Sequence, residues 1–153
     1  MSQCRVALIA LTALAAAACD ETTAPPLLSS TYRLVAVDGR PLPVPFGPDG
    51  SLLLAGSLDF RDLDRARSGA VTEGLVRQVQ EVRRPDQTIV RTETEYRYFI
   101  EGDRLRIDLC PPGSACLVAT ELAGPIAADR RELRLTHFVA GKPGSVYRFL
   151  AGG

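Results

Sequence analysis

The sequence has 153 residues, with 18 basic and 18 acidic side chains, so its formal net charge is zero. This balance excludes the broad basic footprint of a nucleic-acid-binding domain and the polybasic patch of a peripheral membrane protein. The chain has one histidine, His137, and its one methionine is Met1. Histidine-rich metal centres and thioether copper sites are therefore excluded as well.

The first 18 residues have the organisation of an export signal. Arg5 precedes an apolar run of 13 residues, 6–18, in which leucine, isoleucine and valine come first and alanine follows. A helix that crosses a bilayer needs about 20 apolar residues, whereas the apolar region of a signal peptide needs about 7 to 15. A buried core helix is the alternative, but alanines bury little area, and the polar, proline-containing sequence that follows does not continue such a helix.

Cys19 stands directly after three alanines, residues 16–18. This arrangement resembles the lipobox of bacterial lipoproteins, in which small or aliphatic residues precede the cysteine that receives diacylglycerol. The resemblance implies cleavage between Ala18 and Cys19, attachment of lipid to the Cys19 sulfur, and contact with a membrane through that lipid. The expected location is the exported side of the bacterial cell envelope, with the choice between inner and outer membrane left open.

The rest of the chain divides into a tether and one domain. Residues 19–29 are expected to be the lipidated cysteine and a flexible tether, because Pro25 and Pro26 disfavour a helix. Residues 30–153 have a length that suits a single domain with a core of useful size.

Alternation of apolar and polar residues predicts an all-β domain. The clearest case is residues 104–110, where Leu105, Ile107 and Leu109 share one face and charged side chains occupy the other. Turn-forming residues separate such segments. About eight short antiparallel strands predict an up-and-down barrel or a strongly curled sheet. The expected strands are residues 30–37, 51–61, 71–83, 88–100, 104–110, 117–121, 132–138 and 145–150.

The third of these segments, residues 71–83, has two interpretations. Its apolar residues also fit one face of a helix that Thr72 could cap. A strand is favoured because residues 80–98 are typical of a long hairpin that turns at residues 85–87. The many arginine and glutamate side chains of that hairpin are expected on the solvent side, where they oppose edge pairing.

Two cysteines remain after export. Cys4 lies within the signal sequence and Cys19 is expected to be acylated, which leaves Cys110 and Cys116 on either side of a Pro-Pro-Gly-Ser-Ala turn. In an exported protein, this pair predicts a structural disulfide.

Residues 40–50 contain four prolines, which lack the amide donor that a central strand requires. This segment is expected to be a loop that crosses one end of the barrel. It could act as a lid or as a rigid connection.

The domain resembles small bacterial lipoproteins with a lipocalin-like barrel. The shared features are the lipobox cysteine, a short polar tether, an opening strand "TYRLVAVDGRPLP" and a closing strand with "VYRF". The sequence lacks the Gly-x-Trp signature of lipocalins, and Tyr32 occupies the corresponding strand.

The sequence predicts no enzymatic activity, no cofactor and no metal. It contains no nucleophile, phosphate-binding or metalloprotease motif, and His137 shares a strand face with Leu133 and Leu135, as a structural histidine would. Acidic pairs such as Asp62 with Asp64, or Glu93 with Glu95, lie in solvated charged stretches.

Two functions remain. A hollow barrel would be a binding module for a small apolar ligand near the membrane. A filled barrel would be an interaction domain that contacts another envelope protein. The candidate contact residues are Phe46, Tyr96, Tyr98 and Phe138.

Overall fold

The computed structural model describes residues 28–29, 31–61 and 71–152. The expected signal sequence, Cys19, most of the tether and the pair Asp62 and Asp64 lie outside the described residues.

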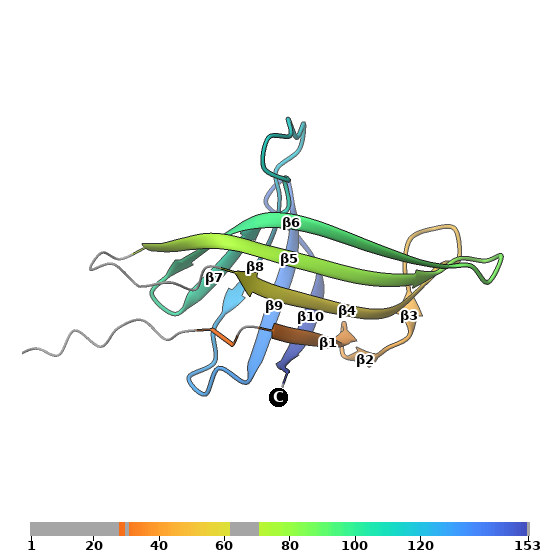
Figure 1. Cartoon of the computed structure of the whole chain (residues 1–153), viewed down its shortest axis with the longest axis horizontal. Coiled ribbons are helices and arrows are strands. Elements are labelled where there is room, and N and C mark those ends of the chain that lie inside the picture. Colours follow the sequence, from red (N-terminus) through yellow and green to blue (C-terminus); the bar gives the residue numbers. More distant parts are fainter. Residues whose placement is uncertain (1–27, 30, 62–70, 153) are drawn as a thin grey trace, which may run out of the picture.

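The domain is a closed antiparallel barrel (Figure 1). Ten strands follow the order β2-β1-β10-β9-β8-β7-β6-β5-β4-β3, and pairing of β1 with β4 closes the sheet. Eight strands, β1 and β4 to β10, form the barrel, and the two short strands β2 and β3 lie beside the junction of β1 and β4. The strands are β1 (Thr31–Val37), β2 (Arg40–Pro41), β3 (Val44–Pro45), β4 (Leu52–Arg61), β5 (Val71–Arg83), β6 (Ile89–Glu101), β7 (Arg104–Asp108), β8 (Thr120–Pro125), β9 (Glu132–Val139) and β10 (Lys142–Ala151).

The segment with two interpretations is a strand. All thirteen residues of β5, Val71–Arg83, pair with β6, so the helical alternative is wrong. The turn between them contains the expected residues: the Gln87 amide donates to the Arg84 carbonyl at 2.9 Å, and Gln87 has a positive φ of 69°. The helical spacing of the apolar residues on β5 wrongly suggested that they share one face. In the strand, Leu75 faces outward, whereas Val76 is fully buried.

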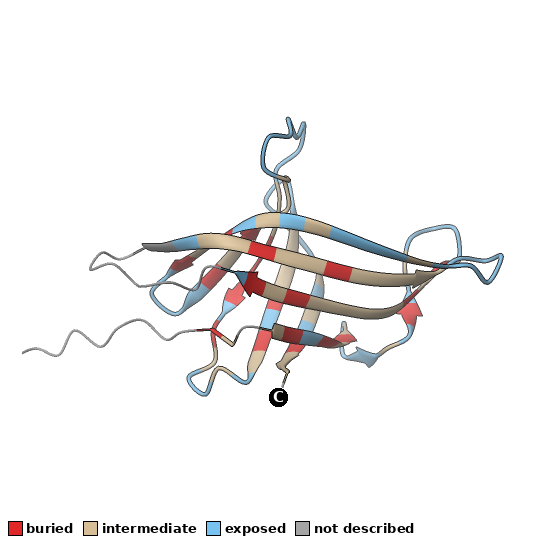
Figure 2. Ribbon diagram, in the orientation of Figure 1, coloured by how far each residue is buried: buried red, intermediate tan, exposed pale blue. Residues whose placement is uncertain are grey.

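Large side chains fill the interior at the end of the barrel where β1 and β4 pair, and Figure 2 marks the buried residues along the strands. Tyr32, Tyr98 and Phe149 are almost completely buried there. The Phe60 ring lies edge-on to Tyr32 at 5.9 Å and to Tyr98 at 5.1 Å, which is a favoured aromatic geometry. The alternation predicted for residues 104–110 is also present, since Leu105 and Ile107 are both fully buried.

The strand predicted over residues 117–121 is misplaced. The structure has β8 at Thr120–Pro125, and Leu117 and Val118 are exposed in the loop before it. Their apolar side chains resemble the start of a strand, but the Cys110–Cys116 loop continues past them before the chain can pair with β7. Pairing begins where the Leu109 amide donates to the Thr120 carbonyl at 2.9 Å.

The proline-rich segment is more than a crossing loop. Among the described residues, β1 and β4 pair only over Thr31–Arg33 with Asp59–Ser57. Beyond those residues β2 pairs with β1, and β3 pairs with β4, so the segment extends both edges of the opening. Prolines are tolerated in these two strands because each strand lies at a sheet edge.

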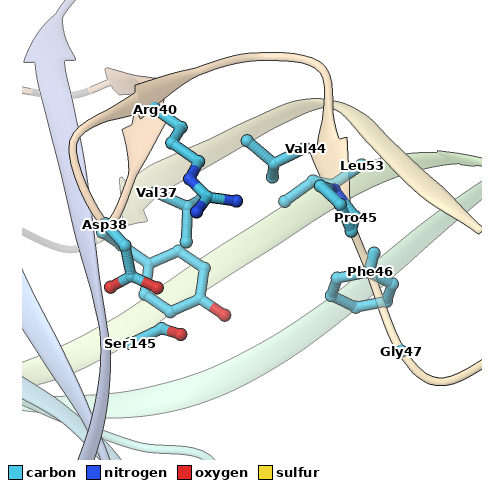
Figure 3. A pocket seen from close by; sticks show the side chains of 10 residues that line it. Val37, Asp38, Arg40, Val44, Pro45, Phe46, Gly47, Leu53 and Ser145 are labelled. Carbon is cyan, nitrogen blue, oxygen red and sulfur yellow. The ribbon is translucent and has the colours of Figure 1, made fainter.

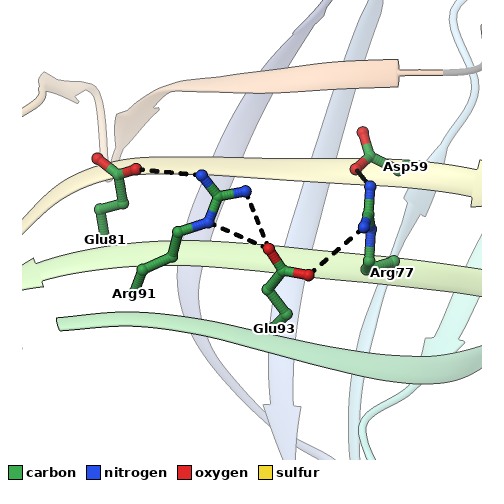
Figure 4. Close-up of polar contacts among 5 residues, drawn as sticks. All are labelled: Asp59, Arg77, Glu81, Arg91 and Glu93. Carbon is green, nitrogen blue, oxygen red and sulfur yellow. Dashed lines mark hydrogen bonds and ion pairs between the residues drawn. The ribbon is translucent and has the colours of Figure 1, made fainter.

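Charged side chains cover the outer surface of β4, β5 and β6 (Figure 4). Arg77 forms ion pairs with Asp59 at 3.0 Å and Glu93 at 3.4 Å. Arg91 forms ion pairs with Glu93 at 2.9 Å and Glu81 at 3.8 Å. These pairs are partly exposed to solvent, so each contributes at most about 1 kcal/mol to stability.

Candidate functional site

A cleft of about 430 Å³ opens where β1 and β4 separate (Figure 3). Its volume lies within the roughly 300–1,000 Å³ typical of small-molecule sites. The side chains that line it come from β1, the β1–β2 turn, the proline-rich segment, β4 and β10. They are Val37, Asp38, Arg40, Val44, Pro45, Phe46, Gly47, Leu53, Ser145 and Tyr147.

The floor of the cleft is apolar. Val44 and Leu53 are buried, with 5% and 1% of their surfaces exposed, and they are register partners in β3 and β4. Val37 pairs with Tyr147 and packs against the same core. An irregularity of β1 between Leu34 and Ala36 shifts the register, and this shift turns Val37 inward.

Asp38 fixes one side of the rim. Asp38 and Gly39 have positive φ values of 51° and 75°, as a two-residue hairpin turn between β1 and β2 requires. The Asp38 carboxylate accepts a hydrogen bond from the Val146 amide at 2.7 Å. This bond, together with a hydrogen bond from the Ser145 hydroxyl, lowers the pKa of Asp38 below its ordinary value. Asp38 is therefore a fixed negative charge at neutral pH.

Arg40 follows this turn, and its guanidinium projects toward the cleft (Figure 3). Among residues 28–29, 31–61 and 71–152, no carboxylate forms an ion pair with Arg40. The positive charge of Arg40 contributes to the lowered pKa of Asp38 without an ion pair between the two side chains. An exposed guanidinium above an apolar floor can bind an anionic group through charge-assisted hydrogen bonds.

Tyr147 supplies a neutral hydroxyl to the cleft. Burial raises the pKa of its phenol, and the negative charge of Asp38 raises that pKa further. The His137 ring lies edge-on to the Tyr147 ring, with 6.4 Å between centroids. His137 thus packs beside a residue that lines the cleft.

A second hollow, of about 450 Å³, adjoins the cleft and shares Phe46 and Gly47 with it. Val82 and Val90, which are paired in the long β5–β6 hairpin, form part of its wall. The loop that carries Phe46 is closed by a hydrogen bond from the Phe46 amide to the Ser51 carbonyl at 2.8 Å. Phe46 therefore stands between two hollows at the same end of the barrel.

The predicted disulfide is present. Cys110 and Cys116 are bonded, with their Cα atoms 5.9 Å apart, in the loop between β7 and β8. The enclosed loop is short, so the bond contributes roughly 2 kcal/mol by its effect on chain entropy. It does not line the cleft.

The aromatic residues proposed for contact with a partner have different environments. Tyr98 is fully buried and belongs to the core, and Tyr96 packs against that core. Phe46 lines the cleft, and Phe138 is half-buried. Phe99, the residue after Tyr98, faces outward, and the Arg106 guanidinium lies over its ring at 4.5 Å from the ring centroid.

Sequence reasoning missed the roles of Asp38, Arg40 and Tyr147. Asp38-Gly39 was recognisable as a turn, but no motif marks Arg40 as a side chain that reaches a cleft. Tyr147 joins Asp38 and Arg40 only through the pairing of β1 with β10.

The described residues contain no cluster of three or more histidine, cysteine, aspartate or glutamate side chains that could hold a metal ion. The described part of the chain also has no helix of the length and apolarity needed to cross a bilayer.

Comparison with known proteins finds no matching family model, no matching curated protein and no matching solved structure.

Proposed function

We propose that the protein is a lipid-anchored lipoprotein of the bacterial cell envelope whose barrel binds a small ligand in the cleft. The ligand has an apolar body and an anionic group. The observation that carries this proposal is the position of Arg40, which lies above the apolar floor without a carboxylate partner among the described residues. The closed eight-stranded barrel supports a lipocalin-like relationship for the domain.

The two parts of the cleft favour different parts of such a ligand. An apolar body gains roughly 25 cal/mol for each Å² of apolar surface that its contact with the floor removes from water. A hydrogen bond to a charged group contributes about 1.5–3 kcal/mol in addition. Asp38 is itself an anion, so the charged donor that the cleft offers to an anionic group is the Arg40 guanidinium.

Ligand binding is tested by titrating the protein with a fluorescent long-chain carboxylate and with the uncharged alcohol of the same length. We expect saturable uptake of both, with tighter binding of the carboxylate. Arg40→Gln should weaken carboxylate binding about tenfold or more and leave alcohol binding unchanged, because only the charged hydrogen bond is lost.

The matched control is Arg33→Gln, which removes an exposed arginine from the outer face of β1, the strand that pairs with β2. This variant should bind both probes as the unchanged protein does. Equal losses in the two variants, or no saturable uptake of either probe by the folded protein, would contradict the proposal. Haem and small aromatic anions are further ligands to be tested in the same titration.

The membrane anchor rests on the apolar run of residues 6–18 and the small residues before Cys19. Mass spectrometry of the protein extracted from membranes should give a mature N-terminus at Cys19 that carries diacylglycerol. Cys19→Ser should abolish the lipid mass and release the protein from the membrane fraction. A mature chain that begins at another residue would disprove this part of the proposal.

Contact with another envelope protein is the second candidate function. The filled end of the barrel favours it, since Tyr32, Phe60, Tyr98 and Phe149 occupy the interior there. A stable protein that takes up no probe would leave this function as the better account.

A further inference from the structure

In the part of the chain that the structure describes, one edge of β6 lacks a partner strand along more than half of its length. β6 pairs with β5 from Ile89 to Glu101, but it pairs with β7 only from Arg97 to Glu101. Residues 89–96 therefore have a free edge, which no strand among the described residues covers. In Figure 1 this part of β6 runs away from β7 toward the tip of the long hairpin.

The hairpin turn shows which backbone groups point outward along the free edge. At the turn, the Arg84 amide donates to the Thr88 carbonyl at 2.9 Å. Hydrogen-bonded and non-hydrogen-bonded pairs alternate along an antiparallel ladder, so Val90, Thr92 and Thr94 exchange hydrogen bonds with β5. The amides and carbonyls of the intervening residues 89, 91, 93 and 95 are then directed to the free edge.

We propose that a second copy of this chain pairs with the free edge of β6, antiparallel and about a two-fold axis at Thr92. This register places Arg91 opposite Glu93 of the partner subunit, once on each side of the axis. It also pairs Ile89, which is 60% exposed, with the partner's Glu95. Opposite charges across an antiparallel pair are stabilising, and like charges directly opposite each other are destabilising.

The charges favour this register over its neighbours. A shift of two residues in one direction places Glu93 opposite Glu93 of the partner subunit, and a shift in the other direction places Arg91 opposite the partner's Arg91. A shift of one residue would turn the outward side chains to the opposite face. Arg91 and Glu93 already contact each other within one chain (Figure 4), so the dimer would extend an existing ion-pair network.

The length of the edge limits the strength of the association. Pairing over residues 89–95 uses nearly all of the free edge, because Arg97 is occupied by Asp108 of β7. Two paired strands bury less than the roughly 1,200 Å² of a standard stable interface. We therefore expect a reversible dimer that forms at high protein concentration. This inference does not depend on ligand binding.

Disulfide cross-linking tests the register. In the full chain with Cys4→Ser and Cys19→Ser, Thr92→Cys places two thiols opposite each other across the axis. Non-hydrogen-bonded partners have Cα atoms about 4.5 Å apart, which a disulfide can span. Mild oxidation should convert most of this variant to a covalent dimer. Sedimentation of the unsubstituted chain should show an average mass that rises with concentration.

Two further variants serve as controls. In Thr94→Cys the two thiols lie four residues apart along the strands, about 13 Å, so we expect no cross-link. The double variant Val90→Cys/Thr94→Cys should cross-link again, because these positions are partners in the proposed register. Equal cross-linking of Thr92→Cys and Thr94→Cys would overturn the proposal. The absence of any cross-link, together with a monomer at every concentration, would overturn it as well. That result would leave the free edge of β6 available to a strand of another protein.

Discussion

Ile107→Arg is expected to leave the domain largely unfolded at room temperature. Ile107 is fully buried between its register partners Tyr98 and Leu122, which are buried as well. A guanidinium at this position would be enclosed by apolar side chains and would lack a carboxylate partner. The cost is several kcal/mol, which is comparable to the whole stability of an ordinary domain. Thermal and urea denaturation followed by circular dichroism measure the loss.

Arg106→Ile is the matched control, one residue along the same strand. The Arg106 side chain faces outward, where it lies over the Phe99 ring and its guanidinium is 3.8 Å from Glu121. Loss of an exposed cation–π contact and a surface ion pair should cost about 1 kcal/mol or less. Two variants with the same melting temperature would show that the inner and outer faces of β7 are wrongly assigned.

Gly124→Ala is expected to destabilise the domain by about 3 kcal/mol, a large effect for one methyl group. A Cβ atom at this position would overlap the carbonyl oxygen of Arg134 and would lie 3.0 Å from its carbonyl carbon. Both atoms belong to the backbone of β9, so no side-chain rotation can relieve the overlap. The strands β8 and β9 would have to separate, which would disturb the buried residues beside them.

Gly152→Ala controls for the general effect of replacing a glycine with alanine. A Cβ atom there would lie 3.6 to 3.7 Å from atoms of Thr31, which is an ordinary contact distance. We expect a change of less than about 0.5 kcal/mol in the free energy of unfolding. A midpoint of urea denaturation that is the same for both glycine variants would show that β9 does not pass Gly124 as closely as described.

Strands that bury one face and expose the other could be predicted from the sequence. Alternation in residues 104–110 and 132–138 is a local property, and the structure places the predicted apolar residues Ile107, Leu133 and Leu135 inside. The failure at residues 117–121 has a physical cause, because an exposed loop can carry apolar side chains such as Leu117 without burying them. Alternation of apolar and polar residues indicates which face of a strand is buried. It does not indicate which other strand it pairs with.

The cleft was not predictable for the same reason. Its floor depends on the register of β3 with β4, and its rim depends on the pairing of Val37 with Tyr147. A register irregularity in β1 decides that Val37 faces inward. These strand pairings cannot be recognised from the residues that adjoin each strand in the sequence. The Asp38-Gly39 turn can be recognised, because its backbone conformation restricts which residue types can occupy it.

The position of β1 determines the order in which the barrel can be assembled. From β4 to β10 each strand pairs with the next along the chain, so these strands can form as successive hairpins with low loop-closure cost. β1 pairs with β10, where Leu34 lies opposite Phe149, near the other end of the chain. The first strand to be synthesised can pair early with β4 over Thr31–Arg33, but its longer pairing with β10 has to wait for the end of the chain. A nascent chain that has not yet reached Phe149 can form the successive hairpins from β4 onward and can pair Tyr32 with Leu58, but Leu34 still lacks its partner on β10.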